Sequence, residues 1–167
     1  MTLSEFNLLN EIEVRAELFK CCGSTRWSEM VAAKKPFNSI SELKIISDVI
    51  WNTCAETDWL EAFTHHPKIG DKKSLEQKFA ATAEWAANEQ SGVNDADKNV
   101  IDHLAKGNEE YENKFGYIFI VCASGKTAYE MLDLLNERIR NTQEVELKNA
   151  AAEQNKITHL RIDKLFS

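Results

Sequence analysis

No part of this 167-residue sequence has the composition of a membrane-spanning helix. Residues 1–14, MTLSEFNLLNEIEV, mix acidic with apolar residues and lack the basic start and small-residue cleavage site of a signal peptide. The final residues, DKLFS, differ from the S-K-L peroxisomal address. We therefore expect an intracellular protein, with the cytoplasm as its default location.

A concentrated basic surface is also missing. The net charge is −7, and the basic residues of the last third alternate with acids, as on a solvated helix surface. Nucleic acid and anionic membranes repel an acidic protein that has no basic patch. We expect neither of them as a partner.

Patterns typical of metal, disulfide and nucleotide sites are absent as well. The four cysteines show no C-x-x-C spacing, so we expect them to be reduced and mostly buried: Cys21, Cys22, Cys54 and Cys122. No H-E-x-x-H motif, phosphate loop, dinucleotide fingerprint or nucleophile triad is present. The sequence therefore predicts no metal site.

What the chain does contain is a series of helix signals. Its length suits one domain, residues 1–167, and its 43% hydrophobic and 28% charged residues are ordinary for a globular protein. Helix starts are indicated by the pairs Thr2/Glu5, Ser39/Glu42, Ser74/Gln77, Thr127/Glu130 and Asn141/Glu144. Apolar stripes at helical spacing are Leu43, Ile46, Val49 and Ile50, and Met131, Leu134, Leu135 and Ile139.

Turn residues divide the chain between these signals. Glycine and proline interrupt the helical pattern at Gly23, Pro36, Pro67, Gly70, Gly92, Gly107 and Gly116. We therefore predict an all-α, single-domain helical bundle of about six to nine helices.

One segment does not fit a surface helix. Residues 117–125, YIFIVCASG, are bulky and β-branched, which predicts a short extended piece near residues 117–123. With no other strand to pair with, its backbone would need other hydrogen-bond partners, and a ligand could supply them. A continued buried helix or pairing with a loop fits the same residues equally well.

Two stretches could carry acid–base chemistry. In HHPKIGD, residues 65–71, Pro67 stiffens the backbone after His66 and could hold the imidazole at the mouth of a pocket, although a histidine before proline is more often an ordinary turn residue. Glu89 and Gln90 end a helix before Gly92, where a carboxylate opposes the helix dipole. On local sequence alone, a solvent-facing Glu-Gln pair explains them better.

Taken together, these stretches resemble a known family. HHPKIGD, NEQSG, KFGYIFIVCASGK and the closing ERIRNTQEVELKNAAAEQNKITHLRIDKL occur in the order and spacing of the OHCU decarboxylases. Those enzymes of urate breakdown act on 2-oxo-4-hydroxy-4-carboxy-5-ureidoimidazoline (OHCU) and yield (S)-allantoin. The resemblance covers nearly the whole chain, and it implies an all-α, commonly dimeric enzyme that uses no metal or organic cofactor.

The resemblance also implies a set of site residues. The catalytic pair would be His66 and Glu89, and the small-molecule substrate would be bound by Pro67, Gln90, Arg161 and the backbone at Ile118, Phe119 and Ile120. The family often has a serine at the position of Ala86, so one substrate hydrogen bond worth ~1 kcal/mol would be missing here. The competing interpretation is a non-catalytic helical module that binds a purine-related ligand or a protein partner.

Overall fold

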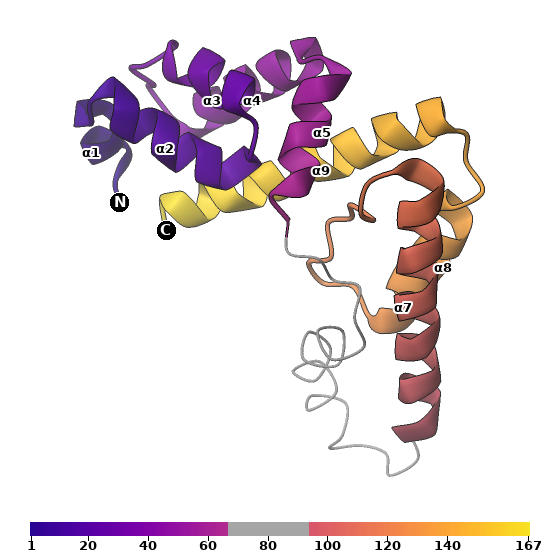
Figure 1. Ribbon diagram of the computed structural model, residues 1–167. Helices are drawn as coiled ribbons and strands as arrows, with labels where there is room; N and C mark the ends of the chain where they lie inside the picture. The colour runs from indigo at the N-terminus through magenta and orange to yellow at the C-terminus, as the bar shows by residue number, and fades with distance from the viewer. Residues whose placement is uncertain (67–93) are drawn as a thin grey trace. The chain divides into compact units, whose positions relative to one another are not determined.

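The computed structural model describes residues 1–66 and 94–167. These residues form eight α-helices and no strand (Figure 1), which confirms the predicted all-α class. The helices are α1 (Leu3–Leu8), α2 (Glu11–Cys22), α3 (Thr25–Ala32), α4 (Ile40–Thr53), α5 (Glu56–Thr64), α7 (Asn94–Phe115), α8 (Ala128–Arg138) and α9 (Gln143–Leu165). None of these eight is both long and apolar enough to cross a membrane.

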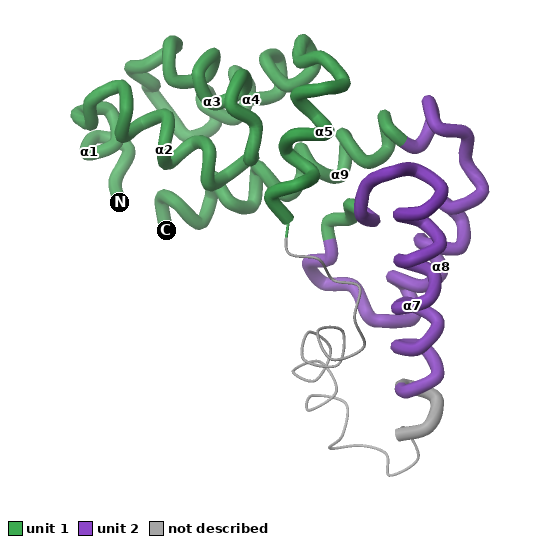
Figure 2. Tube along the Cα trace, viewed as in Figure 1, with its two compact units in different colours: residues 1–66, 120–122, 147–167 green, residues 67–119, 123–146 purple. Residues whose placement is uncertain are grey.

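The chain divides into two compact units that are not continuous in sequence (Figure 2). The first contains Met1–His66, Ile120–Cys122 and Leu147–Ser167, and the second contains Pro67–Phe119 and Ala123–Glu146. Helix α9 therefore starts in the second unit and continues through the first. That the whole chain forms a single domain stays a prediction.

Tryptophan side chains tie the helices of the first unit together. Trp27 is fully buried and its indole N–H donates to the Ser47 carbonyl of α4 at 3.2 Å. Trp51 of α4 donates in the same way to the Ala151 carbonyl of α9 at 2.9 Å. Because each ring is apolar but its N–H needs a partner when buried, these bonds fix how the helices meet. Both tryptophans are core residues.

The second unit depends on a close approach of α7 to α8. A Cβ atom placed on Gly107, in the middle of α7, would lie 2.6 Å from Cδ2 of Leu135 in α8. Leu135 is fully buried. Gly107 was expected to interrupt the helical pattern, and that expectation is wrong: this glycine continues the helix and gives a neighbouring side chain room.

Three of the four predicted helix starts that lie in the described residues are confirmed. Thr2 and Thr127 form complete capping boxes, and the Ser39 side chain accepts the backbone N–H of Glu42. The start predicted at Asn141 is wrong by one residue, because Thr142 accepts the N–H of Val145 at 3.4 Å. Ser74 and Gln77 lie outside the described residues. The prediction of a core stripe on α4 also fails at Val49, whose exposed fraction is 60%.

Residues 118–123 are neither helix nor strand, as the sequence indicated for this stretch. The alternative of a continued buried helix is therefore excluded. Within the segment, Ile120 and Cys122 are buried. Ile120–Cys122 belong to the first unit, whereas Ile118 and Phe119 belong to the second.

Candidate active site

His65 and His66 follow the end of α5 and contact different partners. The N–H of His65 donates to the Ala62 carbonyl at 3.2 Å, and its ring meets Phe19 edge-on, with the centroids 4.9 Å apart. Gly23, in the left-handed conformation after α2, lies so close that an added Cβ would be 2.7 Å from Cβ of His65. His65 is exposed and rests against Phe19 and Gly23, whereas His66 is half-buried and is the chemical candidate.

The His66 ring contacts Gln154, a fully buried residue of α9. The Nε2 atom of His66 and Oε1 of Gln154 are hydrogen-bonded. At the other end of the glutamine amide, Nε2 donates to the Cys22 carbonyl at 3.2 Å and to Oγ1 of Thr158 at 3.3 Å. Sequence analysis singled out His66 but missed Gln154, because no local pattern connects residues that are 88 positions apart.

Burial lowers the pKa of His66 below its usual value. The hydrogen bond that His66 donates to Gln154 opposes this shift, while the positive charges of Arg161 and His65 add to it. An ordinary histidine titrates near pH 6.5, so a lowered pKa leaves His66 neutral at pH 7. A neutral imidazole can accept a proton, which is the property that a general base needs.

Arg161 is brought to the same place by the C-terminal end of α2. It lies seven residues, or about two turns, after Gln154 on α9, and its Nη1 atom donates to the Cys21 carbonyl at 3.2 Å. The last carbonyls of a helix have no partner within it and carry partial negative charge, so they attract a guanidinium or amide N–H. The carbonyls of Cys21 and Cys22 satisfy Arg161 and Gln154 in this way.

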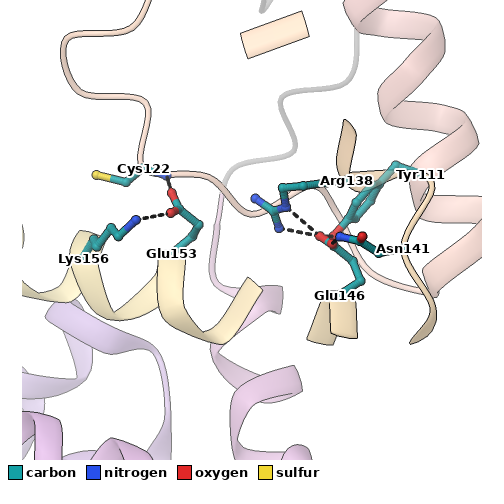
Figure 3. Close-up of polar contacts among 7 residues, drawn as sticks. All are labelled: Tyr111, Cys122, Arg138, Asn141, Glu146, Glu153 and Lys156. Carbon is teal, nitrogen blue, oxygen red and sulfur yellow. Dashed lines mark hydrogen bonds and ion pairs between the residues drawn. The ribbon is translucent and has the colours of Figure 1, made fainter. Parts of the chain in front are cut away.

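The non-helical segment is held by α9 as well. The backbone N–H of Cys122 donates to Oε2 of Glu153 at 2.7 Å, and the other carboxylate oxygen pairs with Lys156 (Figure 3). Glu153 directly precedes Gln154 in α9. One turn of this helix therefore contacts both the His66 ring and the backbone of Cys122, two residues after Ile120.

The other two residues of the assigned segment belong to the second unit. Phe119 is half-buried, and its ring meets Tyr111 edge-on, with the centroids 5.1 Å apart. The guanidinium carbon of Arg138 lies 4.7 Å from the centre of the same ring, within the range of a cation–π contact. Ile118 is also half-buried. The Phe119 side chain is thus fixed by packing, and its backbone remains the part proposed to meet a ligand.

A buried ionic cluster supports Phe119, and sequence analysis did not find it. Glu146 is fully buried and accepts hydrogen bonds from Arg138 at 2.5 and 2.8 Å, from Asn141 at 2.8 Å and from the Tyr111 hydroxyl (Figure 3). Burial raises the pKa of Tyr111, so its hydroxyl remains a donor. Removing one partner of a buried ion pair costs about 3–5 kcal/mol, so we assign this cluster to stability.

The predicted site residues that the structure describes belong to both compact units. His66, Ile120 and Arg161 belong to the first unit, and Ile118 and Phe119 to the second. Pro67, Ala86, Glu89 and Gln90 lie outside the described residues. The remaining histidines, His103 and His159, lie on helices, with His159 paired to Asp48 at 2.7 Å. In the described ranges no three His, Cys, Asp or Glu residues form a metal-binding group.

The described helices define an all-α protein in which a half-buried histidine is hydrogen-bonded to a buried glutamine. A sequence model described as OHCU decarboxylase matches residues 7–163. The chain belongs to the OHCU decarboxylase family, so the family predicted from its motifs is confirmed.

Individual proteins agree with this assignment. The chain is 40% identical over 149 residues to the Uric acid degradation bifunctional protein TTL of Arabidopsis thaliana, covering 88% of this chain and 45% of that protein. It is 22% identical over 171 residues to the 2-oxo-4-hydroxy-4-carboxy-5-ureidoimidazoline decarboxylase of Haloferax volcanii, covering 100% and 97%. The chain thus spans less than half the length of the Arabidopsis relative.

Two solved structures share the fold. The first is an OHCU decarboxylase crystallised in the presence of (S)-allantoin, with 40% identity, a TM-score of 0.71 and coverage of 90% of this chain and 97% of that one. The second is an (S)-allantoin synthase with 18% identity, a TM-score of 0.69 and coverage of 100% and 54%, and at this identity it supports the fold alone.

Proposed function

We propose that this chain decarboxylates OHCU to (S)-allantoin and CO2, with His66 and Glu89 as its acid–base pair. The observation that carries the proposal is the half-buried His66 imidazole, whose lowered pKa keeps it ready to accept a proton. Family membership and the 40% identical OHCU decarboxylase structure support the same reaction. Glu89 enters from the family resemblance.

In the proposed reaction the bond between C4 and the carboxylate breaks and CO2 leaves. The electron pair forms a C4=C5 double bond, while the C5=N pair moves to the nitrogen, which takes up a proton. His66 removes the C4 hydroxyl proton as the C4 carbonyl forms, and C5 receives a proton on one face, which sets the S configuration. The substrate itself accepts the electrons, so the proposal requires no metal or organic cofactor.

Arg161 and the segment around Ile120 are proposed to hold the substrate. Arg161 supplies a positive charge near His66, which suits the substrate carboxylate and ring carbonyls. Backbone groups of Ile118, Phe119 and Ile120, with Pro67 and Gln90, would orient the ring. Holding the carboxylate out of the ring plane aligns its breaking bond with the π system. The loss of the family's serine at Ala86 would affect affinity more than reaction type.

We also propose that the chain forms a homodimer, on the family resemblance, and that it acts in the cytoplasm. Light scattering coupled to gel filtration tests the dimer, and a monomer at micromolar concentration contradicts it.

The His66→Asn substitution tests the function. We expect the variant to remain folded and to lose acceleration of (S)-allantoin formation, because asparagine cannot take the proton. Circular dichroism follows the product after urate oxidation and hydrolysis in situ, and enantiomeric excess separates enzymatic product from racemic spontaneous product. His103→Asn, which changes an exposed histidine of α7, is the matched control.

Two outcomes would count against the proposal. A wild-type rate in His66→Asn removes His66 from the mechanism. Racemic product at the spontaneous rate from the unaltered chain would instead favour the non-catalytic helical module, which would bind a purine-related ligand without converting it.

A further inference from the structure

Gln154 is a polar side chain placed where a polar side chain is costly. It is fully buried on α9, and a buried amide destabilises the folded state unless its donors and acceptor find partners. The amide nitrogen of Gln154 donates to Cys22 and Thr158, and its amide oxygen is hydrogen-bonded to His66. The side chain is therefore held in one orientation.

The hydrogen-bond partners of Gln154 determine where its side-chain NH2 group and its side-chain oxygen lie. The Cys22 carbonyl can only accept a hydrogen bond. The Thr158 hydroxyl donates its own hydrogen to the Gln154 backbone carbonyl at 3.0 Å, so its oxygen is left to accept. Two acceptors at one end of the side chain require the NH2 group there. The carbonyl oxygen of the Gln154 side chain must then face His66.

This orientation determines where the imidazole carries its hydrogen. An amide oxygen has no hydrogen to give, so the ring nitrogen that meets it must be a donor. That nitrogen is Nε2 of His66. In the neutral ring only one nitrogen is protonated, and the hydrogen bond made by one nitrogen selects the state of the other.

We propose that Gln154 is a positioning residue that fixes the tautomer of His66, with the hydrogen on Nε2 and the proton-accepting lone pair on Nδ1. The consequence for catalysis rests on the proposed function. During decarboxylation, Nδ1 would receive the substrate proton, and the Gln154 oxygen would stabilise the resulting imidazolium through Nε2–H. A residue of α9 would thus determine the orientation of the His66 ring.

The tautomer can be measured without any substrate. Long-range proton–nitrogen NMR correlations of the full chain, labelled with ¹⁵N-histidine, distinguish protonated from unprotonated ring nitrogens, and His66→Asn identifies the signals of His66. Above the pKa of His66 we expect protonated Nε2 and unprotonated Nδ1. The opposite tautomer, or an equal mixture, in the unaltered protein overturns the proposal.

The Gln154→Leu substitution tests the cause. Without the amide oxygen we expect both tautomers of His66 to be populated and kcat to fall about 10-fold, the factor that corresponds to one lost hydrogen bond, with a smaller change in KM. Asn155→Leu is the matched control: it removes an amide from the next position of α9, where Asn155 donates to Asp48 at 2.7 Å. We expect that control to keep the tautomer and the rate.

The outcomes separate this proposal from the proposed function. An unchanged tautomer in Gln154→Leu overturns the positioning role. The expected tautomer in the unaltered chain, together with full activity of His66→Asn, leaves the positioning role intact and contradicts the catalytic one. If Gln154→Leu does not fold, the measurement on the unaltered protein decides alone.

Discussion

At the scale of the residue, burial and neighbouring positive charge lower the pKa of the His66 imidazole. Burial and the positive charges of Arg161 and His65 all favour its neutral form. A base with a lowered pKa stays unprotonated to a lower pH than an ordinary histidine. Activity that depends on it should therefore persist into mildly acidic solution.

The expected pH dependence follows from the direction of that shift. As pH rises, kcat/KM should increase through a pKa below the usual 6.5, because the neutral form is the active one. Arg161→Gln removes a positive charge, so the pKa of His66 should rise and the acidic limb should move to higher pH. NMR titration of the His66 ring, alongside kcat/KM profiles, measures both.

Lys164→Gln, an exposed change in the last turn of α9, is the control for Arg161→Gln. It should leave the His66 pKa nearly unchanged. An acidic limb above the usual value in the unaltered protein would contradict the expected shift, as would a titration that ignores the loss of Arg161.

Individual residues also show what sequence could and could not reveal. His66 was found because a proline follows it, which is a local signal. Gln154 and the Glu146 cluster gave no such signal, since a buried glutamine or glutamate in an amphipathic helix has the same sequence pattern as an exposed one. Their roles depend on partners that only folding brings near.

At the scale of the element, α9 has the largest share in arranging the candidate site. Its residues Glu153, Gln154 and Arg161 contact the non-helical segment, the His66 ring and the end of α2. Three helix starts could be predicted from their capping residues, but the residues that pack against α9 could not. The Gly107 expectation failed for a related reason, because a glycine that admits a neighbour looks like one that ends a helix.

Glu153→Ala should weaken substrate binding. Loss of the carboxylate leaves the Cys122 N–H without this acceptor, and the segment before it would be less firmly placed. If that segment binds the ring, KM should rise about 5- to 10-fold, the equivalent of roughly 1 kcal/mol for one hydrogen bond, with less effect on kcat. Steady-state kinetics with freshly made substrate give both constants.

Glu153→Gln is the conservative counterpart, because its amide oxygen can still accept the Cys122 N–H. It should retain a KM close to that of the unaltered chain. A KM that rises equally in both variants would assign the effect to the carboxylate charge and its pair with Lys156 instead of to the segment.

At the scale of the whole molecule, the two compact units share one continuous helix. Residues 143–146 of α9 belong to the second unit and the rest to the first. Since a helix loses cooperative hydrogen bonds wherever it is broken, we expect both units to unfold in one transition, as a single domain would.

Urea denaturation with two probes tests this expectation. In a Trp85→Phe variant, fluorescence reports only on Trp27, Trp51 and Trp59 of the first unit. Hydrogen exchange of the α7 and α8 amides reports on the second. Coincident midpoints would support one domain, whereas separate midpoints would show two independently stable parts.

The fold class was predictable from the chain because repeated caps and apolar stripes are local properties. The division into units was not, because it joins Ile120–Cys122 to Met1–His66, which ends more than fifty residues earlier, and to Leu147–Ser167, which begins more than twenty residues later. Pro67, Ala86, Glu89 and Gln90 remain predictions on the family motif alone.

The adjacency of Glu153 and Gln154 makes the candidate site sensitive to insertions. Consecutive positions of an α-helix point about 100° apart, so a single alanine inserted between Leu147 and Ala152 would rotate every later side chain relative to the start of α9. Substitutions of exposed residues of this helix do not change the directions in which Glu153 and Gln154 point. The number of residues between the start of α9 and Glu153 is therefore a tighter constraint on the candidate site than the chemical identity of most exposed residues of this helix.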